Sequence, residues 1–112
     1  MSRRDHVEAR CTVCRLHATL CICALVPRLR TRTRLVLLVH YREARKPSNT
    51  GQLAARCVER SSVEIFGKRG QVLEAPVIAD DEVPLLMFPH DDAASISLHA
   101  ASKKSIALLV PD

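Results

Sequence analysis

The sequence lacks a long apolar run, and this absence excludes one class of protein. A membrane-spanning helix needs about 18 or more consecutive apolar residues, and no stretch of the 112-residue chain approaches that length. Residues 1–6 are largely polar and no apolar segment follows them, so a secretory signal is not expected either. We therefore expect a protein that stays in the cytoplasm and does not cross a membrane.

Two common nucleotide-binding motifs are also absent. The chain contains neither Gly-x-Gly-x-x-Gly nor Gly-Lys-Ser/Thr, which argues against a Rossmann dinucleotide site and against a P-loop. Its length fits one small domain or part of a larger one, and its hydrophobic fraction of 47% is sufficient for a core. The sequence is therefore that of a globular domain whose function must be sought in other motifs.

The net charge of +5 is unevenly distributed along the chain. Residues 1–60 contain 13 Lys/Arg and 4 Asp/Glu, whereas residues 61–112 contain 4 and 8. Such clustering is typical of a phosphate-binding surface and indicates a nucleic-acid partner, although an ordinary solvated basic face gives the same pattern. The candidate RNA-binding residues are Arg30, Arg32, Arg34, Arg42, Arg45 and Lys46.

Four of the five cysteines lie within 13 residues. Cys11 and Cys14 form a C-x2-C pair, and Cys21 and Cys23 form a C-x-C pair. Four thiolates can hold zinc tetrahedrally and leave no open position, which predicts a structural Zn2+ site. Disulfides are disfavoured without a secretory signal, while an iron–sulfur cluster and His17 as a replacement ligand stay open.

Cys57 stands apart from this cluster and is most simply interpreted as a core residue, because it lies on the apolar side of a predicted helix. The cysteine spacing and the later apolar runs together predict three regions: a flexible N-terminus over residues 1–10, a zinc-binding segment over 11–27, and an α/β domain over 28–112.

Short apolar runs alternate with helical patterns in the third region. Continuous apolar runs of this length are typical of strands buried on both faces, as in a parallel sheet. Their alternation with helical patterns predicts an α/β fold with a mostly parallel sheet. The expected elements are strands at 35–40, 62–66, 85–88 and 105–110, and helices at 49–60 and 93–101.

Polar side chains follow the predicted strands, where ligands bind in open α/β sheets. His40 and Glu43 follow the first strand, and residues 48–50 offer hydroxyl and amide groups at a helix start that suits an anion. Phe88 and Pro89 end the third strand and expose the backbone of the next loop. Each feature also has an ordinary structural explanation, such as helix capping or a strand-to-helix turn.

The sequence ends directly after the last predicted strand. The loop that would follow this strand, and a helix to cover it, are not in the sequence. We therefore expect the chain to be the N-terminal part of a longer α/β domain.

Read together, these segments resemble the DTW-domain family of tRNA-uridine aminocarboxypropyltransferases. The resemblance runs from Cys11 to Asp112, and His17 stands where family members usually have proline. The segments that carry it are Cys11, Cys14, Cys21 and Cys23; Thr31-Arg32-Thr33-Arg34 followed by His40; Glu43 with Pro47-Ser48-Asn49-Thr50-Gly51-Gln52-Leu53-Ala54; Leu86-Met87-Phe88-Pro89 with Asp92-Ala93; and Leu108-Leu109-Val110-Pro111-Asp112.

The resemblance implies a SPOUT-like α/β fold and a specific reaction. Family members use S-adenosylmethionine as co-substrate and transfer its 3-amino-3-carboxypropyl group to N3 of a uridine in tRNA. Asp112 would be the aspartate that opens the family's Asp-x-Thr-Trp motif, whose other residues are absent from a chain that has no tryptophan.

Site roles follow from the same resemblance. Asp112 is the candidate base or orienting carboxylate, while His40 and Glu43 are candidates for positioning the substrate or fixing the loop. The candidate cofactor-binding residues are Ser48, Asn49, Thr50, Phe88 and Pro89. The alternative hypothesis is a non-catalytic, zinc-containing RNA-binding module, which would transfer no group to tRNA even in a version extended past Asp112.

Overall fold

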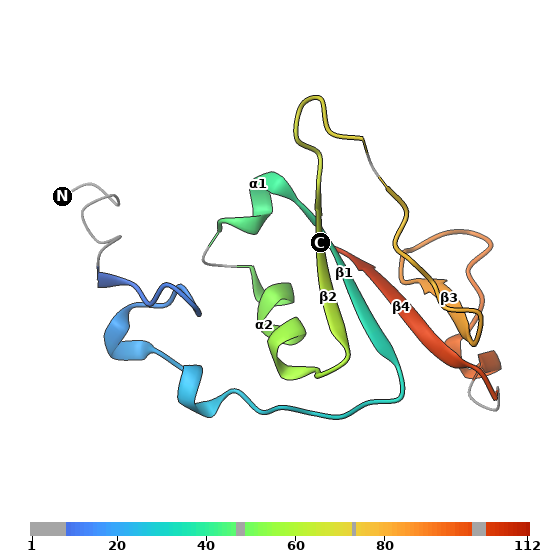
Figure 1. The fold of residues 1–112 in the computed structure, drawn as a ribbon, viewed down its shortest axis with the longest axis horizontal. Helices are drawn as coiled ribbons and strands as arrows, with labels where there is room; N and C mark the ends of the chain where they lie inside the picture. Colours follow the sequence, from blue (N-terminus) through green and yellow to red (C-terminus); the bar gives the residue numbers. More distant parts are fainter. Residues whose placement is uncertain (1–8, 47–48, 73, 100–102) are drawn as a thin grey trace.

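A computed structural model describes residues 9–46, 49–72, 74–99 and 103–112. Within this part of the chain, four parallel strands form one sheet in the order β2-β1-β4-β3 (Figure 1). The expected α/β fold with a parallel sheet is thereby confirmed. The elements are the 3-10 helices η2 (Ala18–Leu20), η3 (Cys23–Leu25) and η4 (Ile96–His99), the helices α1 (Tyr41–Ala44) and α2 (Thr50–Cys57), and the strands β1 (Arg34–His40), β2 (Ser61–Phe66), β3 (Glu82–Leu86) and β4 (Ser105–Pro111).

Strand β1 lies in the middle of the sheet and carries most of the core. Successive side chains of a strand point to opposite faces, so Leu37 and Val39 share one face and Val36 lies on the other. Leu37 and Val39 pack with Ala44 and Ala55 of the two helices in one buried cluster. All three β1 side chains are at most 2% exposed, which explains the continuous apolar run in the sequence.

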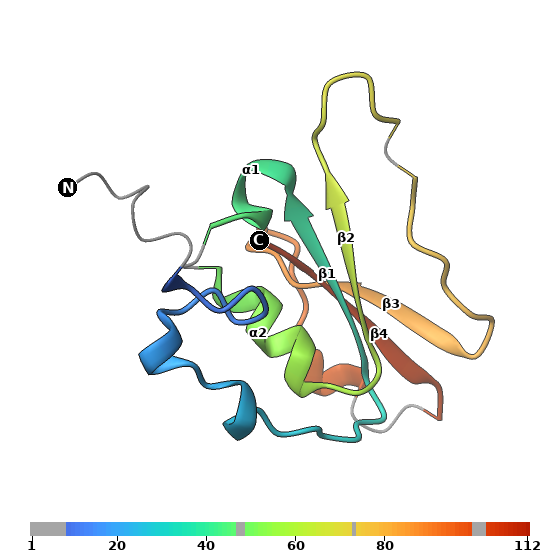
Figure 2. The same cartoon turned by 60° about the vertical axis from the view of Figure 1, so that its left-hand side comes forward.

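Helix α2 covers the Leu37 face of the sheet, and the N-terminal segment lies on the far side of α2 (Figure 2). The side chain of Asn49 caps the helix by accepting a hydrogen bond from the Gln52 amide at 3.0 Å. The helix ends at Cys57, three residues before the expected end, because Val58 is extended and forms a parallel bridge with Leu29. This bridge fixes the connector from the N-terminal segment to β1.

The strand expected at 85–88 ends early, at Leu86, so Phe88 lies outside it. Two other stretches differ from the expectation in type. Residues 41–44, expected as loop, form α1, which the His40 side chain caps by accepting from the Arg42 amide. The helix expected at 93–101 is wrong: its described part contains only η4, and residues 100–101 lie outside the described residues. The hydroxyl of Ser95 accepts from the Ser97 amide, a local bond that competes with helical hydrogen bonding.

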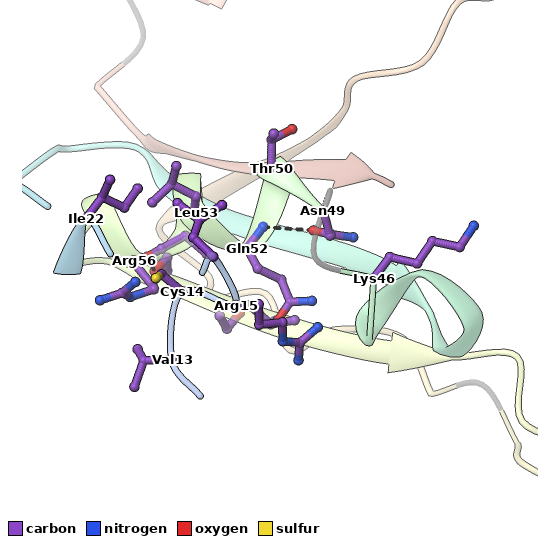
Figure 3. Close-up of a pocket in the computed structure, with 15 residues that line it drawn as sticks. Val13, Cys14, Arg15, Ile22, Lys46, Asn49, Thr50, Gln52, Leu53 and Arg56 are labelled. Carbon is purple, nitrogen blue, oxygen red and sulfur yellow. Dashed lines mark hydrogen bonds between the residues drawn. The ribbon is translucent and has the colours of Figure 1, made fainter. Parts of the chain in front are cut away.

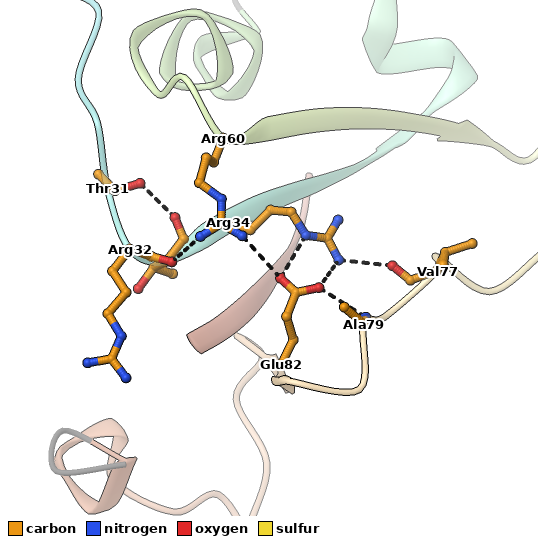
Figure 4. Close-up of polar contacts among 8 residues, drawn as sticks. Thr31, Arg32, Arg34, Arg60, Val77, Ala79 and Glu82 are labelled. Carbon is orange, nitrogen blue, oxygen red and sulfur yellow. Dashed lines mark hydrogen bonds and ion pairs between the residues drawn. The ribbon is translucent and has the colours of Figure 1, made fainter. Parts of the chain in front are cut away.

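The third strand begins three residues earlier than expected because a buried ion pair satisfies the charge of its first residue. Glu82 is only 8% exposed and forms a bidentate pair with Arg34, with both N–O distances at 2.9 Å (Figure 4). The Ala79 amide also donates to this carboxylate, at 3.1 Å. The Arg34 hydrogen bond, followed by that amide, lowers the pKa of Glu82 to about 2. The pair joins β3 to the amino end of β1.

This ion pair predicts an acid-sensitive fold. The pKa of Glu82 is lowered on folding, so its contribution is complete above its ordinary pKa of 4.5 and is lost as the pH falls from there to about 2. We expect Glu82→Gln to lower the melting temperature at pH 7 by several degrees and to flatten its fall between pH 5 and pH 2. Circular dichroism at several pH values measures both effects.

The pair between Arg30 and Glu59 supplies a matched control. It has a similar N–O distance of 3.0 Å, but its side chains are 89% and 43% exposed, and exposed pairs contribute little. Glu59→Gln should leave the acid profile unchanged. An identical response of the two variants would contradict the role assigned to Glu82.

Among the described residues, no helix is long and apolar enough to span a bilayer.

Candidate functional site

The four clustered cysteines converge on one point. The sulfur atoms of Cys11, Cys14, Cys21 and Cys23 all lie within 4.8 Å of one another, and the Cys11–Cys23 and Cys14–Cys21 pairs are each 3.7 Å apart. A tetrahedral ion with Zn–S bonds of about 2.3 Å keeps its sulfurs about 3.8 Å apart. All four cysteines are free thiols, and the donor set and its spacing fit a zinc ion.

The local backbone and the crowding of the sulfurs act on the thiol pKa values in opposite directions. The backbone amides of Cys14 and Val13 are the main reasons that the pKa of Cys11 is lowered to about 6. At Cys21 the Cys23 amide also acts to lower the pKa, but the three neighbouring sulfurs together raise it to about 11. Four thiolates cannot share this space without a cation, which a divalent metal supplies.

A tight loop between the cysteine pairs links this cluster to the sheet domain. The Cys11 amide donates to the Leu16 carbonyl at 2.8 Å, and the Arg15 amide donates to the Cys11 carbonyl at 2.9 Å. Arg15 has a positive φ of 63°, and its guanidinium donates to the carbonyl of Ala44 at the end of α1. His17 lies outside the cluster, where its ring caps η2, and Cys57 is not part of the cluster either.

A second group of residues meets at the carboxyl ends of β1 and β4. The Asp112 amide donates to the Leu38 carbonyl at 2.8 Å, and the His40 amide faces the Asp112 carbonyl at 3.5 Å. Leu108 and Val110 share the sheet face of Leu35 and Leu37 by register, so the side chain of Asp112 follows on the same face. That face is the one covered by α2, and the Asp112 side chain lies against the first turn of this helix.

Gly51 makes this approach possible. A Cβ atom built on Gly51 would lie 2.6 Å from Oδ2 of Asp112 and 3.1 Å from a methyl carbon of Leu37. Any other residue would have to displace the carboxylate and press on a buried side chain. The glycine therefore places a carboxylate beside the free amides at the N-terminus of α2, where a negative charge is favourable.

We expect Gly51→Ala to give no stabilisation, although alanine favours a helix over glycine by about 1 kcal/mol. The contacts with Leu37 and Asp112 should cancel this gain. Ala54→Gly is the matched control, because Ala54 is exposed on the same helix, and it should lose about 1 kcal/mol. Chemical unfolding compares the two variants. A gain of the full propensity difference in Gly51→Ala would mean that the position has room for a side chain.

His40 and Glu43 make contacts that fix the loop after β1. The His40 ring caps α1 and packs edge-on against Phe66, with ring centroids 5.6 Å apart. Gly67, whose φ is 91°, leaves room for this ring, because a Cβ there would lie 2.5 Å from it. The Glu43 carboxylate pairs with Lys46 at 2.6 Å. Of the two roles predicted for His40 and Glu43, these contacts fit the fixing of the loop.

The candidate cofactor-binding residues fall into two separate places. Asn49 and Thr50 line a cavity of about 350 Å3 beside α2, and Ser48 lies outside the described residues. Phe88 and Pro89 line a second cavity, of about 640 Å3, above β3 and β4. Among the described residues, therefore, the sequence-predicted set does not line one pocket.

The candidate RNA-binding residues differ in how they are held. Arg34 is held in the buried pair with Glu82, and Arg30 and Lys46 form more exposed ion pairs. Arg32 donates to the Lys104 carbonyl at 3.2 Å. Arg42 stacks on the Tyr41 ring, and Arg45 is exposed. Two other arginines, Arg15 and Arg56, line the cavity beside α2.

Sequence reasoning did not predict the cavity that Arg15 and Arg56 line, nor the close approach of Asp112 at Gly51. A signal existed for Gly51, because a glycine inside the first turn of a predicted helix is unfavourable unless something approaches closely. No comparable signal existed for the two arginines, which come from different regions of the chain and meet only in the folded protein.

The family profile of the DTW domain matches residues 8–110. This range contains the four clustered cysteines, both α-helices and all but the last residue of β4, and it ends two residues before Asp112. Neither a curated protein nor a solved structure is significantly similar to the chain. Because the match spans nearly the whole sequence and the fold agrees with the expected α/β class, the chain belongs to the DTW domain family.

Proposed function

We propose that the protein is a tRNA-modifying transferase that moves the 3-amino-3-carboxypropyl group of S-adenosylmethionine to N3 of a uridine. Membership of the DTW domain family supports a role in tRNA modification. The observation that carries the chemical part of the proposal is the Asp112 carboxylate, which lies at a strand end against the first turn of α2. Ligands of open α/β sheets bind beside such strand ends.

The proposed reaction needs little more than positioning and control of one proton. The uridine N3 loses its proton and forms a bond to the methylene carbon attached to sulfur. The bond between that carbon and sulfur breaks, and its electron pair stays on the sulfur as methylthioadenosine leaves. Asp112 accepts the N3 proton or orients the base, and holding both reactants in line supplies most of the rate.

The second cavity is the proposed location of the co-substrate. Its walls include the apolar side chains of Leu85, Phe88 and Leu108, which suit an adenine ring, and the polar side chains of His90 and Asp92. The zinc site has a structural role in this proposal, since four thiolates leave no open position. Reduced cysteines accord with the cytoplasm, where we place the protein.

Position-specific labels in the co-substrate test the proposal. tRNA is incubated with the protein and S-adenosylmethionine that carries its label either in the carboxypropyl chain or in the methyl group. We expect the first label alone to enter tRNA, at a uridine located by mass spectrometry. Transfer of the methyl label would indicate a methyltransferase. Binding of tRNA without transfer of either label would support the non-catalytic RNA-binding module.

A further inference from the structure

The cavity of about 350 Å3 lies between the cysteine segment (residues 11–27), α2 and the start of β2 (Figure 3). Arg15 comes from the loop between the cysteine pairs, Arg56 from α2, and Lys46 from the start of the connection that follows α1. Asn49, Thr50, Ser61 and Ser62 add hydroxyl and amide groups, and the apolar wall includes Leu16, Ile22 and Leu53.

Among the residues that the structure describes, this cavity is lined by basic side chains and by no acidic one. Lys46 is balanced by Glu43 at 2.6 Å. Within the described ranges, by contrast, neither Arg15 nor Arg56 forms an ion pair. Arg15 uses one N–H group to bind the Ala44 carbonyl. The cavity therefore holds two guanidinium charges without an acidic partner.

Arg56 carries the clearest sign that a ligand is expected. Its Nη1 atom is buried and has no hydrogen-bond partner among the described residues. No other buried side-chain nitrogen or oxygen of the described residues lacks a partner. A buried donor left without a partner is costly, so native structures almost always satisfy it. Arg56 also lines the cavity, so an anion bound there would balance the charge of its guanidinium.

We propose that this cavity binds a phosphate group of the RNA backbone. Guanidinium groups bind phosphate oxygens with two parallel hydrogen bonds, and Arg15 and Arg56 both line the cavity. Thr50, at the start of α2, also lines the cavity and adds a hydroxyl group. The inference rests on the proposed function, because a tRNA-modifying enzyme must hold the backbone near the modified base.

The cysteine segment contributes directly to the proposed phosphate site. Arg15 immediately follows the metal-binding Cys14, and both residues line the cavity. The cysteine cluster thus forms one wall of a phosphate site whose other walls belong to the sheet domain. A rival explanation is that Arg15 and Arg56 only offset the negative charge of a metal bound to four thiolates, and the test separates the two.

The test measures tRNA affinity as a function of salt for Arg15→Gln and Arg56→Gln. Each variant should bind about tenfold more weakly than wild type, with the slope of log K against log salt reduced by about 0.7 to 0.9 for one lost phosphate contact. Arg69→Gln is the control, because Arg69 is exposed on the β2–β3 connection and does not line the cavity. It should keep the wild-type affinity and slope.

Two further measurements make the outcome decisive. Arg56→Lys keeps the charge but loses the planar fork, so it should recover the slope and only part of the affinity. Pyrophosphate should compete with tRNA for wild type more strongly than for Arg56→Gln. Equal competition, or wild-type affinity and slope in both glutamine variants, would overturn the proposal.

Metal content distinguishes the rival explanation. We expect Arg56→Gln to keep the same metal content as wild type. Loss of metal with unchanged tRNA binding would overturn the phosphate site and support charge compensation. The labelled-transfer assay is independent: transfer by wild type together with unaffected binding in the variants would remove the phosphate site but keep the proposed reaction. If the variants bind tRNA more weakly but wild type transfers no label, the phosphate site is kept and the proposed reaction is removed.

Discussion

Cys14→Ser is expected to abolish stoichiometric metal binding and to unfold the cysteine segment. The purified wild-type protein should carry one zinc ion per chain, held by four sulfurs that already lie at tetrahedral spacing. In this segment, residues 11–27, no side chain is buried. Without an apolar core of its own, most of its folding free energy must come from the metal, about 10 kcal/mol or more in small zinc modules.

Elemental analysis measures the metal, and limited trypsin digestion measures the fold of the segment. Cleavage after Arg15 should become fast in Cys14→Ser and in wild type treated with a chelator. Cys57→Ser is the matched control, because Cys57 is a free cysteine outside the cluster, and it should keep full metal content. Iron in place of zinc would identify a different metal centre, and metal retained by Cys14→Ser would mean that this thiolate is not a ligand.

Loss of the metal should also remove one wall of the cavity beside α2, without unfolding the sheet. Arg15 connects the segment to the carbonyl of Ala44 and forms part of the cavity wall beside α2. An unfolded segment would remove this wall while leaving the β1 core, in which Leu37 and Val39 are buried, unchanged. The melting transition of the sheet should therefore survive chelation, while the proposed phosphate site should not.

Most of the sheet could be predicted because its strands are local apolar runs. Strands β1, β2 and β4 begin and end within one residue of their expected limits. The start of β3 could not be predicted, because the charge of Glu82 is tolerated there only through Arg34, which lies 48 residues away in sequence. Similarly, α2 ends early because Val58 pairs with Leu29, a contact that no helical periodicity reveals.

The candidate site also has one part that could be predicted from the sequence and one part that could not. The four thiols were predicted because metal ligands close in sequence leave a spacing pattern, and the family resemblance is confirmed by a match over residues 8–110. The cavity beside α2 was not predicted, because Arg15 and Arg56 gain their meaning only from burial and from the lack of an acidic neighbour. Residues that act by charge in a folded cavity carry no local signature.

Asp112→Asn is expected to lower the rate of group transfer by about 10² to 10⁴, the usual contribution of a general base. The substitution keeps the size of the side chain and its place against Gly51, so tRNA affinity and stability should stay near wild type. Single-turnover transfer of the carboxypropyl label measures the chemical step apart from binding.

Asp91→Asn serves as the control, because Asp91 is exposed in the loop after β3 and does not line the second cavity. It should react at the wild-type rate. If Asp112→Asn also reacts at that rate, the carboxylate beside α2 only places a negative charge at the start of the helix, and the proton of N3 must leave by another route. A rate that falls in Asp112→Asn and rises again with pH would instead indicate that solvent hydroxide replaces the missing base.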